Sequence, residues 1–160
     1  MASSTNKKAI VERFDRELLK GFVNPQAWLT PEGAELMSTS GNVSVSPYSD
    51  IKAVYFVKDT DRPPFSSERR LFTSRPKSEG LWVRMLFRDG DVMDGIVSNN
   101  LLQLEHFGFT IVPPDPSSNC QRLFVPKAAL ADIKVLGVIG SPLRRRKRVP
   151  PSESQISLFE

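Results

Sequence analysis

The sequence contains one cysteine, Cys120, and one histidine, His106. A lone cysteine cannot form an intramolecular disulfide, which is typical of a protein from a reducing compartment. One histidine and one cysteine are also too few for a common zinc cluster. The chain has no glycine-rich phosphate loop, and no serine or cysteine in a nucleophile motif that could pair with His106. We therefore expect a protein that binds other molecules, without catalysis and without a cofactor.

Long apolar runs are missing as well. The first ten residues, MASSTNKKAI, hold no apolar stretch of signal-peptide length, and the segment VLGVIG at 135–140 is too short to cross a bilayer. Apolar residues still make up 39% of the chain, which is enough to build a packed core. We expect a cytoplasmic protein with no membrane partner.

The chain has little net positive charge outside one short segment. The formal net charge is +4, and a single run near the C-terminus supplies more than that. The remainder of the chain is therefore almost neutral, and the basic character belongs to a tail rather than to a binding face. The run consists of Arg144, Arg145, Arg146, Lys147 and Arg148.

The body of the chain contains a weak internal repeat, the feature that best predicts its architecture. Residues 8–23 read KAIVERFDRELLKGFV, and residues 81–97 read LWVRMLFRDGDVMDGIV. In each, an apolar stretch precedes an acidic turn, and a second apolar stretch contains a glycine. We predict an internal duplication, with the second copy lengthened in its loop at 113–119. The correspondence pairs Phe14 with Phe87, Gly21 with Gly95 after a one-residue slip at the turn, Asn24 with Asn99, Gly33 with Gly108, and residues 50–54 with 132–136.

Within each copy the segments are short and separated by turn residues, which is typical of hairpins and meanders. Asp89-Gly90 predicts a two-residue hairpin, and the glycines at 21 and 95 predict bends inside strands. A strand, an Asp-Gly turn, a strand with a late glycine and a closing Ile-Lys-Val strand resemble the small barrels of the Sm-like and SH3-like type. Sm-like proteins often bind RNA through loops, but the matching loops here carry no RNA-binding signature.

The resemblance implies a mainly β fold with two tandem small barrels. We expect the first barrel at residues 1–59, a linker rich in proline and charge at 60–80, and the second barrel at 81–141. Residues 142–160 have no core-forming pattern before the last few positions, so we expect a disordered basic tail.

Other residues that invite a chemical role have simpler explanations. Asp89, Asp91 and Asp94 fit a solvated hairpin better than a metal or acid–base site. His106 fits a partly buried structural histidine, and Cys120 an unreactive thiol. The arginines at 69, 70 and 75 resemble part of the Arg-x-x-x-Arg element of cyclic-di-GMP-binding PilZ domains, without the companion motif. A module that binds a nucleotide second messenger is therefore one alternative.

The chain ends in SESQISLFE, where the pentapeptide QISLF at 155–159 closely resembles the motif by which bacterial polymerases and repair proteins bind the β sliding clamp, DNA polymerase III subunit beta. That motif is usually written Gln-Leu-Ser/Asp-Leu-Phe. The resemblance implies that Gln155 forms the polar hydrogen bond, Ser157 is the tolerated small centre, and Leu158 and Phe159 are the apolar anchors. Ile156 departs from the preferred leucine.

The sequence thus predicts a bacterial replication or repair accessory protein that binds the clamp. The basic run would touch DNA without reading its sequence, because no aromatic residue is interleaved for base stacking. Two alternatives stay open for the tail: the last residues fold back onto the barrels as a strand, or the protein is a tandem Sm-like nucleic-acid binder whose tail adds only electrostatic affinity.

Overall fold

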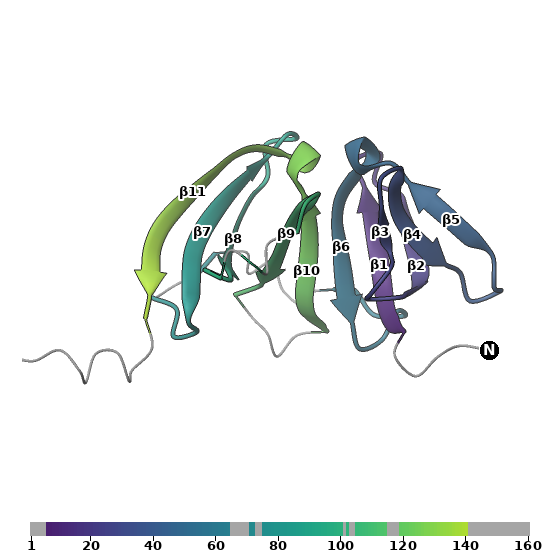
Figure 1. Cartoon of the computed structure of the whole chain (residues 1–160), viewed down its shortest axis with the longest axis horizontal. Coiled ribbons are helices and arrows are strands. Elements are labelled where there is room, and N and C mark those ends of the chain that lie inside the picture. Colours follow the sequence, from purple (N-terminus) through teal and green to yellow (C-terminus); the bar gives the residue numbers. More distant parts are fainter. Residues whose placement is uncertain are drawn as a thin grey trace, which may run out of the picture.

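The computed structural model describes residues 6–64, 71–72, 75–100, 102, 105–114 and 119–140. In this part of the chain the fold is mainly β, as predicted, and the strands form one 11-stranded antiparallel sheet (Figure 1). No helix in these ranges is long and apolar enough to span a membrane. The strands are β1 (Lys7–Arg13), β2 (Leu18–Val23), β3 (Leu29–Thr30), β4 (Gly33–Met37), β5 (Val43–Ser46), β6 (Ile51–Val57), β7 (Gly80–Phe87), β8 (Val92–Val97), β9 (Gly108–Val112), β10 (Cys120–Pro126) and β11 (Leu130–Ile139); the one-turn 3-10 helices η1 (Tyr48–Asp50) and η3 (Lys127–Ala129) precede β6 and β11.

The sheet consists of two five-stranded sets with the same order. The first copy runs β6-β1-β2-β4-β5, with the two-residue β3 added beside β4. The second copy runs β11-β7-β8-β9-β10. The last strand of the first copy, β6, also pairs with the fourth strand of the second copy, β10, and this pairing joins the two sets into one sheet. The predicted duplication is therefore present in the strand pairing.

The first hairpins of the two copies match residue for residue. Lys7 pairs with Val23 in the first copy, and Leu81 pairs with Val97 in the second. In this register Gly21 and Gly95 occupy the same position without any slip. The expected one-residue slip is wrong because Phe87 corresponds to Arg13 rather than to Phe14, and Asn24 likewise corresponds to Ser98 rather than to Asn99.

The turns of these hairpins are also alike. Phe87 donates its backbone N–H to the carbonyl of Asp91, and Gly90 donates to the carbonyl of Phe87, at 2.8 and 3.0 Å. This is a three-residue loop closed by a residue of positive φ, not the predicted two-residue turn. Gly90 has φ 96°, and the equivalent Arg16 has φ 74°. An arginine holds the left-handed position in the first copy at a strain cost that glycine avoids.

The alignment of the closing strands, β6 and β11, differs by three residues from the predicted one. Each follows a proline and a 3-10 turn, so Ile51 corresponds to Leu130. Both strands bulge after one residue, leaving Lys52 and Ala131 out of the pairing with β1 and β7. The shared Asp-Ile-Lys letters at 50–52 and 132–134 are therefore coincidental, and Val54 corresponds to Ile133.

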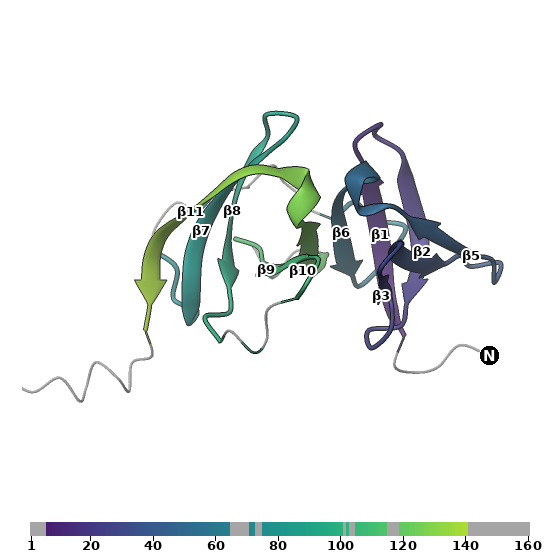
Figure 2. The ribbon, with the colours of Figure 1, turned by 45° about the horizontal axis from the view of Figure 1, so that its top comes forward.

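Two hydrophobic cores lie on opposite faces of the continuous sheet. The second core contains Met85, Phe87 and Leu123 together with Tyr55 and other residues of β6. The first core contains Val11, Trp28 and Val54 together with Phe124 of β10. Since alternate residues of a strand face opposite sides, β6 and β10 each contribute to both cores. Figures 1 and 2 show these two strands side by side in the middle of the molecule.

Candidate functional site

The residues predicted from the sequence to bind partners lie outside the described residues. These are the pentapeptide Gln155, Ile156, Ser157, Leu158 and Phe159, and the basic run Arg144, Arg145, Arg146, Lys147 and Arg148. Arg69 and Arg70 of the PilZ-like element also lie outside the described residues. The last described strand, β11, ends at Ile139 at one edge of the sheet.

The described surface has two hollows that meet where the copies join. One, of about 620 Å³, extends over the ends of β8 and β9. The other, of about 540 Å³, extends over β6, β1 and the loop before β3. Both share Glu105, Thr110 and Arg122 in their lining. Hollows of this size accommodate small ligands or short peptide segments.

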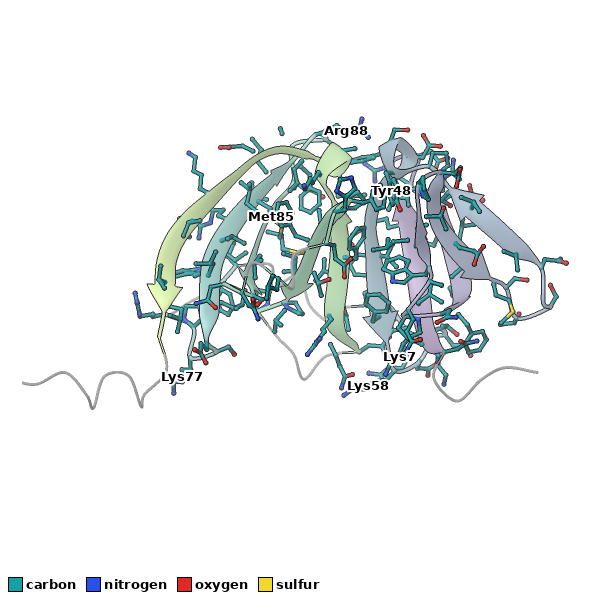
Figure 3. The ribbon with its side chains drawn as sticks, in the orientation of Figure 1. Lys7, Tyr48, Lys58, Lys77, Met85 and Arg88 are labelled. Atoms are coloured by element: carbon teal, nitrogen blue, oxygen red, sulfur yellow. The ribbon has the colours of Figure 1, made fainter. Side chains whose placement is uncertain are left out.

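The lining of these hollows mixes charged and aromatic side chains. At the joint, where β6 pairs with β10, Arg122 lies opposite Phe56, and both residues line the smaller hollow. Trp28 and Lys7 line it as well. Figure 3 shows Lys7 and Lys58 at the same end of the molecule. The described lining residues include no histidine or cysteine.

An ion cluster around the buried Lys52 links the copies at the opposite end of β6. The Lys52 side chain is 8% exposed and donates from Nζ to the carboxylates of Asp89, at 2.8 Å, and Asp91. Burial alone lowers the pKa of Lys52, but the two hydrogen bonds outweigh it and hold this pKa above its usual value. For Asp89 the effect of burial has the opposite sign and raises the pKa. The hydrogen bond from Lys52 outweighs it, so the pKa of Asp89 lies below its usual value. These two aspartates are therefore not simply a solvated hairpin.

The same hairpin contacts the first copy through Arg88. Its guanidinium lies 4.1 Å from the ring centre of Phe14 and donates to the carbonyl of Ser49. The turn at 88–91 therefore belongs to the joint between copies, and its two acidic residues contact Lys52 of the first copy. In the described ranges no group of three or more His, Cys, Asp or Glu residues is arranged to hold a metal ion.

Asp94 is fully buried, contrary to the predicted solvated position. Arg84 donates to both of its carboxylate oxygens, at 2.6 and 3.0 Å. The indole of Trp82 and the backbone N–H of Phe72 also donate to it. Burial raises the pKa of Asp94, and these donors reverse the effect and hold it below the usual value. Asp94 thus ties Phe72, in the connecting segment between β6 and β7, to the second copy. The burial of this carboxylate therefore has a structural explanation.

The remaining singled-out residues also have structural environments. His106 is exposed, so the predicted partial burial is wrong; its ring lies edge to face with Phe107. Cys120 is completely buried, and burial raises the pKa of its thiol to about 12, as expected for an unreactive group. Arg75 donates to the carbonyl of Val138 on β11.

Sequence reasoning missed the residues that make the joint. Asn119 is 2% exposed and binds the connecting segment through its side chain, accepting from Lys58 and Asp59 and donating to Arg62 and Pro63. No local pattern marks this role. A signal did exist for β6 and β10, because AVYFV and LFV are continuous apolar runs, which indicate strands buried on both faces.

The structure defines a mainly β protein built from two five-stranded copies sharing one sheet, with two hollows at their joint. The chain belongs to the family of unknown function DUF6982, which matches residues 5–137. The match includes both copies and none of the pentapeptide. No curated protein and no solved structure matches the chain.

Proposed function

We propose that the protein is a non-enzymatic, cytoplasmic accessory protein of bacterial DNA replication or repair that binds the β sliding clamp through residues 155–159. The observation that carries the proposal is the sequence QISLF, which differs from the clamp-binding pattern only at Ile156. The pentapeptide follows both the sheet, which ends with Ile139, and the family match, which ends at 137. This separation supports a role as a partner-binding peptide.

The energetics suit a reversible contact. Burying a leucine and a phenylalanine contributes about 1.5 to 3 kcal/mol each, and ordering the peptide offsets part of this, so we expect micromolar affinity. Pro150 and Pro151 favour an extended segment between the basic run and the peptide. The basic run at 144–148 then reaches DNA threaded through the clamp and adds affinity through avidity.

We further propose that each copy is a small barrel of the Sm-like or SH3-like type. The support is the shared strand order, the 3-10 turn before each closing strand, and a glycine at the same place in β2 and β8. A side chain at Gly21 would overlap the carbonyl of Met37, and one at Gly95 would overlap Ile111. An experimental structure in which both sets of strands lie flat and unclosed would contradict this part of the proposal.

The direct experiment measures fluorescence polarisation of the labelled peptide 150–160 with purified bacterial β clamp. We expect micromolar binding that Gln155→Ala combined with Phe159→Ala abolishes. A pull-down of the clamp by the full chain should depend on residues 155–159 in the same way. Binding of the clamp by a chain that lacks these residues would refute the proposal.

The nucleic-acid alternative makes a different prediction. If the basic run supplies the affinity, the full chain binds DNA with steep salt dependence in the absence of the clamp. Replacing Gln155 and Phe159 then has no effect, whereas replacing the basic run removes binding. The second-messenger alternative predicts a thermal shift with nucleotides.

A further inference from the structure

The two copies present unlike edges at the two ends of the sheet. Within the described residues, β11 pairs only with β7, and β5 pairs only with β4. In Figures 1 and 2 these strands lie at opposite ends of the molecule. By position in the repeat, β11 is equivalent to β6, and β5 is equivalent to β10. The strands that pair inside the chain thus have counterparts at its two edges.

The internal joint supplies a register for those counterparts. At the joint Phe124 lies opposite Val54, and Arg122 lies opposite Phe56. On β5, Val45 is equivalent to Phe124 and Val43 to Arg122. On β11, Ile133 is equivalent to Val54 and Val135 to Phe56. The same register would therefore place Val45 opposite Ile133 and Val43 opposite Val135. Three of these four side chains are exposed: Val43 by 58%, Val45 by 44% and Val135 by 57%. No described residue of the chain covers these valines, and an apolar side chain gains nothing from exposure to water.

A cavity lies where the equivalent side chain would enter. In the first copy, the ring of Phe124 lies in the first core and packs against Trp28 and Val54. In the second copy, the described residues leave an apolar cavity of about 170 Å³ at the corresponding place. It is lined by Leu81, Val83, Val97, Ser98, Phe109, Ile133 and Val135. Of their equivalents in the first copy, Ala9, Val23, Ala34, Val54 and Phe56 all belong to the core that receives Phe124 or pack against it.

From these observations we infer that β5 of a second copy of this chain pairs with β11 in the way that β10 pairs with β6, with Val45 entering the cavity beside Ile133 and Val135. The contact is head to tail, because each chain offers one edge of each kind. Repeated at every edge, it gives a closed ring if the rotation between chains closes and an open filament if it does not. Pairing also satisfies the backbone groups of both edge strands.

The contact between chains is weaker than the internal joint. Inside the chain, the buried Lys52 adds ion pairs with the partly exposed Asp89 and Asp91. The equivalent of Lys52 on β11 is Ala131, so the contact between chains has no such ion pairs. We therefore expect assembly that depends on protein concentration between the micromolar and millimolar range.

The test is sedimentation velocity of the full chain and of two variants, Val45→Asp and Val135→Asp. Both positions are exposed, and circular dichroism checks that each variant folds. Wild type should assemble as concentration rises, and each variant alone should stay monomeric. An equimolar mixture should form a dimer and stop there, because Val45→Asp keeps an intact β11 and Val135→Asp keeps an intact β5. Leu18→Asp, which changes an exposed apolar residue of the interior strand β2, should assemble like wild type.

Cysteine cross-linking tests the register independently. Oxidising a mixture of Val43→Cys and Val135→Cys chains should give a one-to-one covalent dimer, and neither variant alone should cross-link. A wild-type monomer at every concentration would overturn the inference. It would also fail if the two aspartate variants did not rescue each other, since that result indicates a symmetric contact. These experiments contain no clamp or DNA, so their outcome is separate from that of the proposed function.

Discussion

The ring of Phe124, which belongs to the second copy, packs edge to face against Trp28 of the first copy, with ring centroids 5.2 Å apart. Trp28 also lies edge to face with Phe56, at 5.4 Å. A residue of one copy is therefore part of the other copy's core. The two copies depend on each other for stability, although each has its own set of five strands.

Removing the Phe124 side chain should destabilise the whole body. We expect Phe124→Ala to lower the free energy of unfolding by about 3 to 5 kcal/mol, because a fully buried ring leaves a cavity in the first core. Urea denaturation followed by tryptophan fluorescence measures the change. Val45→Ala is the matched control, since Val45 occupies the equivalent position but is exposed; in dilute solution it should change stability by no more than about 0.5 kcal/mol. Equal effects of the two substitutions would contradict the shared core.

Asp89 should stabilise the joint in a pH-dependent way. Its pKa in the folded chain lies below the unfolded value because the hydrogen bond from Lys52 outweighs burial. The contribution is therefore present above the unfolded pKa, near pH 4, and is lost as the pH falls through the folded pKa. We expect Asp89→Asn to lower the free energy of unfolding by about 1 kcal/mol at neutral pH, after allowance for solvent screening, and by almost nothing in strong acid.

The control for Asp89 is its equivalent in the first copy. Asp15 accepts the same hydrogen bond within its turn, from the backbone N–H of Glu17, but its side chain is 58% exposed. Asp15→Asn should leave stability nearly unchanged from neutral to acid pH. If the free energies of unfolding of wild type and Asp89→Asn differed by the same amount down to pH 2, the charge of Asp89 would not stabilise the joint through Lys52.

Asp94 should control the connecting segment. Replacing Asp94 with asparagine removes the charge that pairs with Arg84. We expect the free energy of unfolding to fall by about 1 to 3 kcal/mol. Because Phe72 donates its backbone N–H to Asp94, exchange of that amide should become faster. Hydrogen exchange with mass spectrometry measures it on a peptide that includes Phe72. Asp132→Asn on β11, where the aspartate is exposed, should leave both quantities unchanged.

Cys120 should be inert in the folded chain. Burial raises the pKa of its thiol to about 12, so at pH 8 both access and the thiolate form are lacking. We expect no reaction with Ellman's reagent until denaturant unfolds the chain. Val135→Cys provides the positive control, since Val135 is 57% exposed and its thiol should react at once. Rapid labelling of native wild type would contradict the buried position.

The mainly β class, the repeat and the position of the turn at Asp89-Gly90, though not its length, were predictable, because turn residues and repeated glycines are local signals. The register of the closing strand was not, since the letters Asp-Ile-Lys recur there by chance while the true match depends on a bulge at Lys52 and Ala131. A bulge is set by pairing with another strand, which no local pattern records.

The roles of charged residues were the least predictable part of the site. Asp89 and Asp94 have the same side chain five positions apart, yet one binds a lysine from the other copy and the other is buried beneath Arg84. Their partners lie on β6 and β7, and the choice between them is made by tertiary packing. The partner-binding prediction at 155–159 is of another kind, because a peptide motif acts by its own sequence and needs no neighbouring strand.

The strand β6 has consequences for how the two halves of the gene can change. Its residues 51–57 are buried on both sides, apart from the partly buried Phe56, whereas the equivalent strand β11 is exposed over most of its length. A substitution in β6 disturbs two cores at once, so we expect selection to remove changes at nearly every codon. We expect the codons for β11 to be tolerant by comparison. Two segments at the same place in their repeats should therefore evolve at different rates.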